Sequence, residues 1–325
     1  MEAAKLPLNL NQRALNSLDG SRPEFSTFKI DEHRLPSGAI VLDFGTRHGG
    51  TIGGGLLLAR ALTADLAQIN LSSMAIGSVP YWPAIQVNTD WPLLACIASQ
   101  YAGWHVQQEG YFAIGSGPAR LLRGREELLT QYQLTERSSR GLVSLETHRL
   151  PGDEIMRGMA EECEITADHL VACVARTASL PGSVQIVARS VEAAMHKLHE
   201  LGFDLRRVHA AVGLAPLPPP ASDDLQAIGW TNDSILYGSH VAMWIAGDAS
   251  EIQHVSGELC SQTSRDFGRP FLDIFEQYDR EFYRIDKLLF SPAQVTLFAV
   301  DSGETFSAGA IHQKVLCRSF GIQLD

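Results

Sequence analysis

HLVACVARTASLPGSVQIVARSVEAAMHKLHE, residues 169–200, joins a strand-like apolar run to a loop and a long helical pattern. From residue 184 to 200, apolar side chains recur at the three-and-four spacing of a buried helix face. Pro181 and Ser183 are signals that start such a helix. A second strand-like run, VHAAVGLAPL, follows at 208–217. This alternation predicts a βαβ unit with a right-handed crossover and a partly parallel sheet.

The loops after these two strands are the first candidates for a ligand site. Strands joined by a crossover run parallel, so RTASLPGS and APLPPPASDD would emerge at the same edge of the sheet, where open α/β sheets bind ligands. Their polar residues also have ordinary structural interpretations, as turn formers or as acids at a helix N-terminus. The candidates from these loops are Thr177, Ser179, Asp223 and Asp224.

Arg189 and Glu192 stand three residues apart in the predicted helix. Side chains at that spacing are neighbours, so the guanidinium and the carboxylate can touch. On one helix alone such a pair is most often solvated and contributes only a few tenths of a kcal/mol. At ~1.5 Å per residue the pair would lie about 9–14 Å from the start of the helix, at a depth suited to a pocket floor.

Composition places the chain among globular proteins. It has 325 residues, 45% hydrophobic and 19% charged, enough for two domains with sizeable cores. A formal net charge of -11 and the absence of basic runs argue against nucleic acid as a partner. The first residues lack the pattern of a signal peptide, and no apolar run could span a membrane. We therefore expect a cytoplasmic protein whose partners are small molecules or copies of itself.

The five cysteines are scattered and form no C-x-x-C pair. This spacing fits buried, reduced thiols better than a disulfide framework. Metal-binding patterns such as H-E-x-x-H are also missing, as are the Walker loop, the dinucleotide-binding glycine pattern and the G-x-S-x-G of serine hydrolases. The motifs therefore predict no metal and no nucleotide cofactor.

The fold class predicted is α/β, in the mixed α+β sense, with two α/β domains. The first would cover 1–130, with a hairpin at 25–46 and a glycine-rich run at 49–55 leading into a helix. The second would cover 131–290 and carry the helix described above. The sequence leaves open whether the C-terminal hairpin, within 291–325, joins the first domain.

AIGSGPAR, residues 113–120, follows a strand-like run. Gly115 and Gly117 would let the backbone approach an anion, and Arg120 could bind that anion through two donors. A tight turn explains the same residues equally well.

Five long blocks of the sequence are specific enough to compare with known families: YAGWHVQ, YFAIGSGPAR, RTASLPGSVQIVARSVE, GLAPLPPPASDDLQAIGWTNDSILYG and GRPFLDIFEQYDREFYRIDKLLFSPAQVTL. In this order they resemble methenyltetrahydromethanopterin cyclohydrolase, and the similarity runs from about residue 28 to the C-terminus. The resemblance implies a cytoplasmic hydrolase of one-carbon metabolism, acting in formaldehyde oxidation or in carbon dioxide reduction. It also implies a homotrimer without metal or cofactor that holds its pterin in a cleft between two α/β domains.

The family's proposed catalytic pair is an arginine followed three residues later by a glutamate, which matches Arg189 and Glu192. A carboxylate suits hydrolysis of the electrophilic methenyl bridge because it can take a proton from water. Arg189 could stabilise that carboxylate, orient it, or contact the carbonyl oxygen of the product. The resemblance further suggests pterin contacts from Ser116, Arg120, Thr177, Ser179, Gln185, Asp223, Asp224, Asn232 and Asp233.

Two alternatives stay open: a homologue that binds the pterin without converting it, and a cyclohydrolase that uses folate. The archaeal pattern of the family has a lysine where this chain has Tyr101, which predicts a different tail on the pterin.

Overall fold

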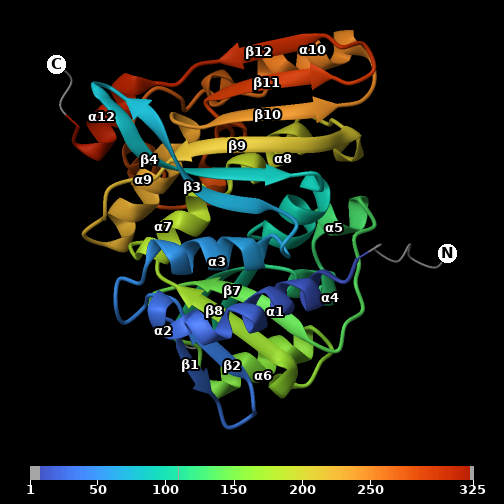
Figure 1. Cartoon of the computed structure of the whole chain (residues 1–325), viewed down its shortest axis with the longest axis vertical. Helices are drawn as coiled ribbons and strands as arrows, with labels where there is room; N and C mark the ends of the chain where they lie inside the picture. Colours follow the sequence, from blue (N-terminus) through green and yellow to red (C-terminus); the bar gives the residue numbers. More distant parts are fainter. Residues whose placement is uncertain (1–7, 109, 323–325) are drawn as a thin grey trace. The chain divides into compact units, whose positions relative to one another are not determined.

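The computed structural model, which describes residues 8–108 and 110–322, divides into two units. Unit 1 contains Met1–Ala67 and Leu94–Gln185, and unit 2 contains Gln68–Leu93 and Ile186–Asp325. Each unit holds a mixed six-stranded sheet, so the predicted α/β class with mixed sheets is confirmed (Figure 1). The chain passes between the units three times, and this division differs from the predicted domains 1–130 and 131–290.

The sheet of unit 1 has the order β1-β2-β8-β7-β6-β5. Its central strands β2, β8 and β7 are parallel, and the outer pairs are antiparallel. All six residues of β8 are buried, as expected for a parallel strand covered on both faces. The predicted hairpin at 25–46 is present over 31–43 as β1 and β2, whereas Phe25–Phe28 at its start forms the helix α2. The strands are β1 Asp31–Arg34, β2 Ile40–Asp43, β5 Trp104–Gln108, β6 Tyr111–Ser116, β7 Gly141–Glu146 and β8 Leu170–Ala175.

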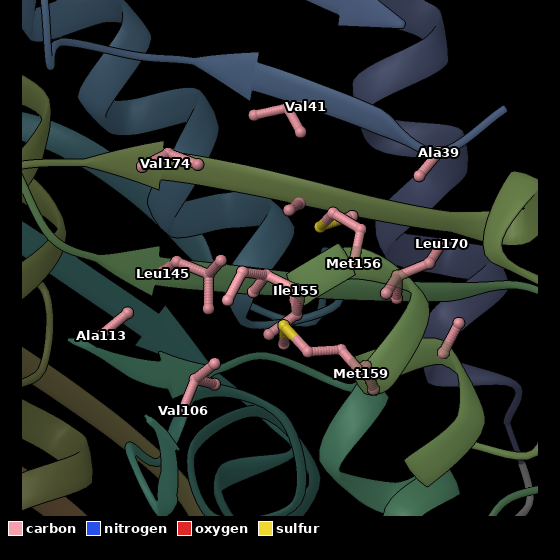
Figure 2. Close-up of a cluster of buried hydrophobic side chains, with 14 of the residues drawn as sticks. Ala39, Val41, Val106, Ala113, Leu145, Ile155, Met156, Met159, Leu170 and Val174 are labelled. Atoms are coloured by element: carbon pink, nitrogen blue, oxygen red, sulfur yellow. The ribbon is translucent and has the colours of Figure 1, made fainter. Parts of the chain in front are cut away.

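The core of unit 1 lies between this sheet and α6. Figure 2 shows Met156 and Met159 of α6 directed toward strand residues such as Leu145 and Val174. The glycine-rich run leads into α3 as predicted. The helices associated with this unit are α1 Leu10–Ser21, α2 Phe25–Phe28, α3 Ile52–Leu62, the π-helix Leu93–Gln100, α4 Ala119–Arg123, α5 Glu127–Gln131, α6 Asp153–Glu162 and α7 Leu180–Val187, with 3-10 turns at Arg22–Glu24 and Ala167–His169.

The sheet of unit 2 has the order β12-β11-β10-β9-β4-β3, in which only β10 and β11 are parallel. The C-terminal hairpin forms β11 and β12 and extends this sheet, beside β10. Its strands are β3 Gln68–Ile76, β4 Val79–Thr89, β9 Val208–Pro216, β10 His240–Ile245, β11 Gln294–Ala299 and β12 Thr305–Gly309. Its helices are α8 Ser190–Glu200, α9 Asp224–Leu236, α10 Ala249–Glu258, α11 Phe271–Gln277 and α12 Gln313–Phe320, with 3-10 turns at Leu205–Arg207, Ser261–Thr263, Phe282–Arg284 and Lys287–Leu289.

Two local predictions were wrong. The strands β8 and β9 belong to different sheets, so they do not form a βαβ crossover and their following loops do not share a sheet edge. The single helix predicted over 184–200 is two helices, because α7 ends at Val187 and α8 begins at Ser190. The apolar spacing continues through the interruption, which is why periodicity alone does not detect it.

Within residues 8–108 and 110–322, none of the helices combines the length and hydropathy that crossing a bilayer requires. The five cysteines are free and buried, which confirms the prediction for the thiols.

Candidate active site

Arg189 and Glu192 lie at the start of α8. Arg189 occupies the N-cap position, and Glu192 lies in the first turn. The Arg189 Nη1 donates to the Glu192 Oε2 over 3.4 Å, and the two side chains are only 10% and 11% exposed. The predicted contact is therefore confirmed, but it lies at a helix N-terminus and not two turns inside a helix. A carboxylate at that end of a helix is favoured by the helix dipole.

The other half of α8 is held by Lys197, whose side chain is fully buried. Its Nζ donates to Thr263 Oγ1 over 3.2 Å and to the carbonyl oxygen of Leu288 over 2.5 Å. Burial lowers the pKa of Lys197 to about 8, and the nearby Asp286 opposes that shift. These contacts fix α8 to the 3-10 turns of unit 2.

The loop after β8 in unit 1 forms a tight turn into α7. Ser179 Oγ donates to the carbonyl oxygen of Arg176 over 2.7 Å and accepts from the Gly182 amide over 3.1 Å. A Cβ at Gly182 would lie 2.0 Å from the Arg176 oxygen, so only glycine fits there. The hydroxyl of Ser179 thus has a structural use, as the turn-former interpretation predicted.

Two buried or half-buried carboxylates near this loop were missed by sequence reasoning. Glu146, the last residue of β7, accepts from Thr177 Oγ1 over 2.5 Å. Asp43, the last residue of β2, accepts from the amides of Gly45 and Thr46 and from the Thr46 hydroxyl. An acid that ends an apolar strand, as in IVLD, was the available signal.

Arg120 is fully buried in α4. Its Nε donates to Glu126 Oε1 over 2.8 Å and its Nη2 donates to the other oxygen of the same carboxylate. The guanidinium also lies 5.1 Å from the centre of the Tyr101 ring, and Nη1 donates to the Ile97 carbonyl oxygen over 3.4 Å. These contacts account for Arg120 without a bound anion.

The candidates on α9 also contact the protein itself. Asp223 is the N-cap and accepts from the Gln226 amide, and Asp224 lies in the first turn. Asn232 Nδ2 donates to the Ile228 carbonyl oxygen over 2.9 Å. The interpretation of the two aspartates as N-terminal acids of a helix is confirmed.

Asp233 is fully buried and ties three helices together. One carboxylate oxygen accepts from the Phe271 amide of α11 over 2.8 Å, and the other accepts from Ser319 Oγ of α12 over 2.5 Å. Burial raises the pKa of Asp233 to about 7.

The predicted residues therefore fall into two groups, one in each unit. Ser116 and Gln185 are buried at 4% and 3% exposure. Among the described residues, no group of three or more His, Cys, Asp or Glu side chains is arranged to hold a metal ion. Unit 1 holds Ser116, Arg120, Thr177, Ser179 and Gln185, and unit 2 holds Arg189, Glu192, Asp223, Asp224, Asn232 and Asp233.

The sequence was compared with models of known protein families. The family model described as Cyclohydrolase (MCH) matches residues 9–320. The chain belongs to this cyclohydrolase family. The three relatives described next match 88–97% of this chain and 87–99% of their own length.

Three such relatives are each named methenyltetrahydromethanopterin cyclohydrolase. The protein from Rhodopirellula baltica is 43% identical over 291 residues, covering 88% of this chain and 87% of the relative. The protein from Methylobacillus flagellatus is 40% identical over 289 residues, covering 89% and 88%. The protein from Methanosarcina barkeri is 34% identical over 319 residues, covering 97% and 99%.

Proposed function

We propose that this chain hydrolyses 5,10-methenyltetrahydromethanopterin to the 5-formyl form, reversibly. The observation that carries the proposal is the buried Arg189–Glu192 pair at the first turn of α8, in a chain 34–43% identical to curated cyclohydrolases. An ordinary solvated ion pair would be exposed, whereas these side chains are about nine-tenths buried.

In the proposed mechanism, Glu192 acts as the general base. It takes a proton from a water molecule whose oxygen adds to the bridge carbon of the pterin. The hydroxyl group of this adduct then loses its proton as the C=O bond forms, the bond from that carbon to N10 breaks, and N10 takes up one proton. The formyl group stays on N5. Water supplies two protons and N10 keeps one, so one proton is released, through Glu192. A positioned base of this kind contributes typically ~10²–10⁴-fold to the rate.

Arg189 supports this chemistry in one of two ways. A guanidinium carries five N–H donors in a planar fork, so it can hold the Glu192 carboxylate and also contact an oxygen of the substrate. At 3.4 Å the contact with Glu192 is long for a charge-assisted hydrogen bond, which leaves room for it to tighten when substrate binds.

Pterin contacts from Ser116, Thr177 and Gln185 remain predictions. Their side chains are buried close to the ends of elements in unit 1. Thr177 also donates to Glu146 within the protein, just as Arg120, Ser179 and Asp233 have partners within the protein. We propose that no metal or other cofactor takes part. Full activity after dialysis against a chelator supports this, and activity restored only by added metal contradicts it.

We further propose that the chain acts as a homotrimer in the cytoplasm. One face of the unit 2 sheet carries Trp244 stacked on Phe298, with ring centres 4.8 Å apart. Trp244 is 38% exposed, and exposed aromatic side chains on a sheet face favour association with a second copy. Sedimentation of the wild type and of Trp244→Ser tests this: a wild-type monomer at working concentration would remove the trimer.

The proposed reaction is tested by following the absorbance of methenyltetrahydromethanopterin with the purified chain. Glu192→Gln should lower kcat by about 10² or more while the protein still binds the pterin. Glu200→Gln, on the last turn of the same helix, is the matched control and should retain activity. Wild-type binding without turnover would favour the binding-protein alternative.

The folate alternative requires a separate measurement. Methenyltetrahydrofolate is offered together with the methanopterin form, and kcat/KM is compared for the two. A preference for folate would contradict the proposed substrate.

A further inference from the structure

Gly213 lies in the middle of β9, where glycine weakens a strand by about 0.5–1 kcal/mol relative to alanine. It pairs with Val87 of β4 on one side and with Val241 of β10 on the other. Its backbone is not in the left-handed region, so conformation does not demand glycine there. A glycine inside a strand often marks close approach of another segment. The reason for Gly213 should therefore lie in what packs on it.

The segment that packs on Gly213 is the first turn of α8. A Cβ at Gly213 would lie 2.3 Å from Ser190 Oγ, 2.9 Å from Val191 Cγ2 and 3.3 Å from Ser190 Cβ. Ordinary contacts of this kind begin at 3.4 Å. The neighbouring residues on the same face of β9, Ala211 and Ala215, are also small and buried. Because the side chains on this face of β9 are small, the first turn of α8 packs close to the strand.

Ser190 fills the space that the missing side chain leaves. It is fully buried, and its hydroxyl has no hydrogen-bond partner among the described residues. Packing, and not a hydrogen bond, is therefore what Ser190 contributes. Ser190 follows Arg189 directly and precedes Glu192 by two residues, on the same helical turn. Any shift of Ser190 must carry that pair with it.

We propose that Gly213 and Ser190 form a seat that positions Arg189 and Glu192 for hydrolysis. Both are positioning residues, because they act through the pair and not on the substrate. This inference rests on the function proposed above and adds to it the feature that sets where the general base stands.

The expected loss of kcat in Gly213→Ala follows from these distances. If Ser190 keeps its buried side-chain rotamer and the strand stays in register, relieving a contact of 2.3 Å to an ordinary 3.4 Å moves the first turn of α8 by about 1 Å. A misplacement of about 1 Å at a reacting centre can lower the rate ~10²-fold. Gly213→Ala should therefore lower kcat by about 10² and change KM for the pterin by much less. A purely structural role would instead reduce the folded fraction and leave kcat per folded molecule unchanged.

The test compares four variants with the wild type by circular dichroism, pterin binding and turnover. Gly213→Ala should remain folded at the assay temperature and bind the pterin. Gly257→Ala is the matched control, because Gly257 lies in α10 of the same unit with open space around it, and it should leave kcat unchanged. Adding Ser190→Ala to Gly213→Ala removes the 2.3 Å contact and leaves only the milder 2.9 Å contact with Val191 Cγ2, so it should recover at least about tenfold of the lost kcat. Ser190→Ala alone completes the cycle.

Each of three outcomes would contradict the proposal. The first is a folded Gly213→Ala variant with the kcat of the wild type, and the second is a loss of kcat that the double variant does not recover. The third is a loss of activity that is fully explained by a smaller fraction of folded protein. If Gly213→Ala fails to fold, Ser190→Thr is used in its place, because it adds a methyl group at the same contact from the helix side. An unchanged kcat in Ser190→Thr would overturn the proposal. If the wild type has no turnover, the proposed function fails by itself. The seat is then judged by crystal structures of wild type and Gly213→Ala, in which an unmoved Arg189–Glu192 pair would overturn it.

Discussion

Replacing Arg120 by methionine separates a structural role from a ligand-binding role for this arginine. In the folded chain its guanidinium forks onto the Glu126 carboxylate, faces the Tyr101 ring and donates to the Ile97 carbonyl oxygen. The Arg120 side chain is 0% exposed and that of Glu126 is 12% exposed. Arg120→Met fills the same space with an apolar chain but leaves the carboxylate without its partner.

The expected cost is that of a broken buried ion pair. Removing one member leaves a buried charge uncompensated, which destabilises by about 3–5 kcal/mol. For domains of this size class each kcal/mol shifts Tm by about 2–4 °C, so Arg120→Met should lower Tm by about 6–20 °C. Replacing both members with apolar residues is often close to neutral. The double variant Arg120→Met with Glu126→Leu should therefore regain most of that loss.

Thermal melts and steady-state kinetics of the two variants provide the assay. If Arg120 is structural, the folded double variant keeps its KM for the pterin within a few fold of the wild type. The reasoning is refuted if Arg120→Met melts like the wild type, or if the double variant is stable and its KM rises tenfold or more. The second result would support a contact between Arg120 and the pterin.

Two further predictions concern titratable groups. Burial raises the pKa of Asp233 from 3.8 to about 7, so between these values the folded protein binds a proton that the unfolded chain has lost, and stability falls as pH rises through that window. Between pH 5 and 7 this proton contributes about 2 kcal/mol to the fall in the free energy of unfolding. In chemical denaturation, the free energy of unfolding of Asp233→Asn should therefore depend less steeply on pH than that of the wild type. An identical pH dependence in the two proteins would contradict the assignment. Burial also raises the pKa of Cys163 to about 12 and that of Cys260 to about 11, so a thiol reagent at pH 8 should label none of the five cysteines until the protein unfolds. Rapid labelling of the native protein would show that at least one thiol is accessible.

The local elements were largely predictable, while their assembly was not. Alternating runs such as VHAAVGLAPL and HLVACVA do form strands, since period-two burial and continuous apolar runs are local properties. The sheet to which a strand belongs depends on pairing with distant segments. β4, from residues 79–89, pairs with β9, from residues 208–216, and no local pattern records that choice. The division into two interleaved units follows from such pairings, and a boundary read from composition cannot represent it.

In the candidate site, too, the sequence predicts local contacts but not the positions that depend on distant segments. Spacing predicted that Arg189 and Glu192 would touch, because three residues of helix bring any two side chains together. Spacing could not predict that the helix breaks immediately before them, which moves the pair from the middle of a helix to its N-terminus. That move matters chemically, since the first turn offers a carboxylate the positive end of the helix dipole. The position of that turn is in turn set by a glycine more than twenty residues away in the sequence, on a strand where glycine has no local advantage. The sequence therefore specifies the proposed catalytic groups locally and their placement through packing. Only their placement requires the folded chain to be seen.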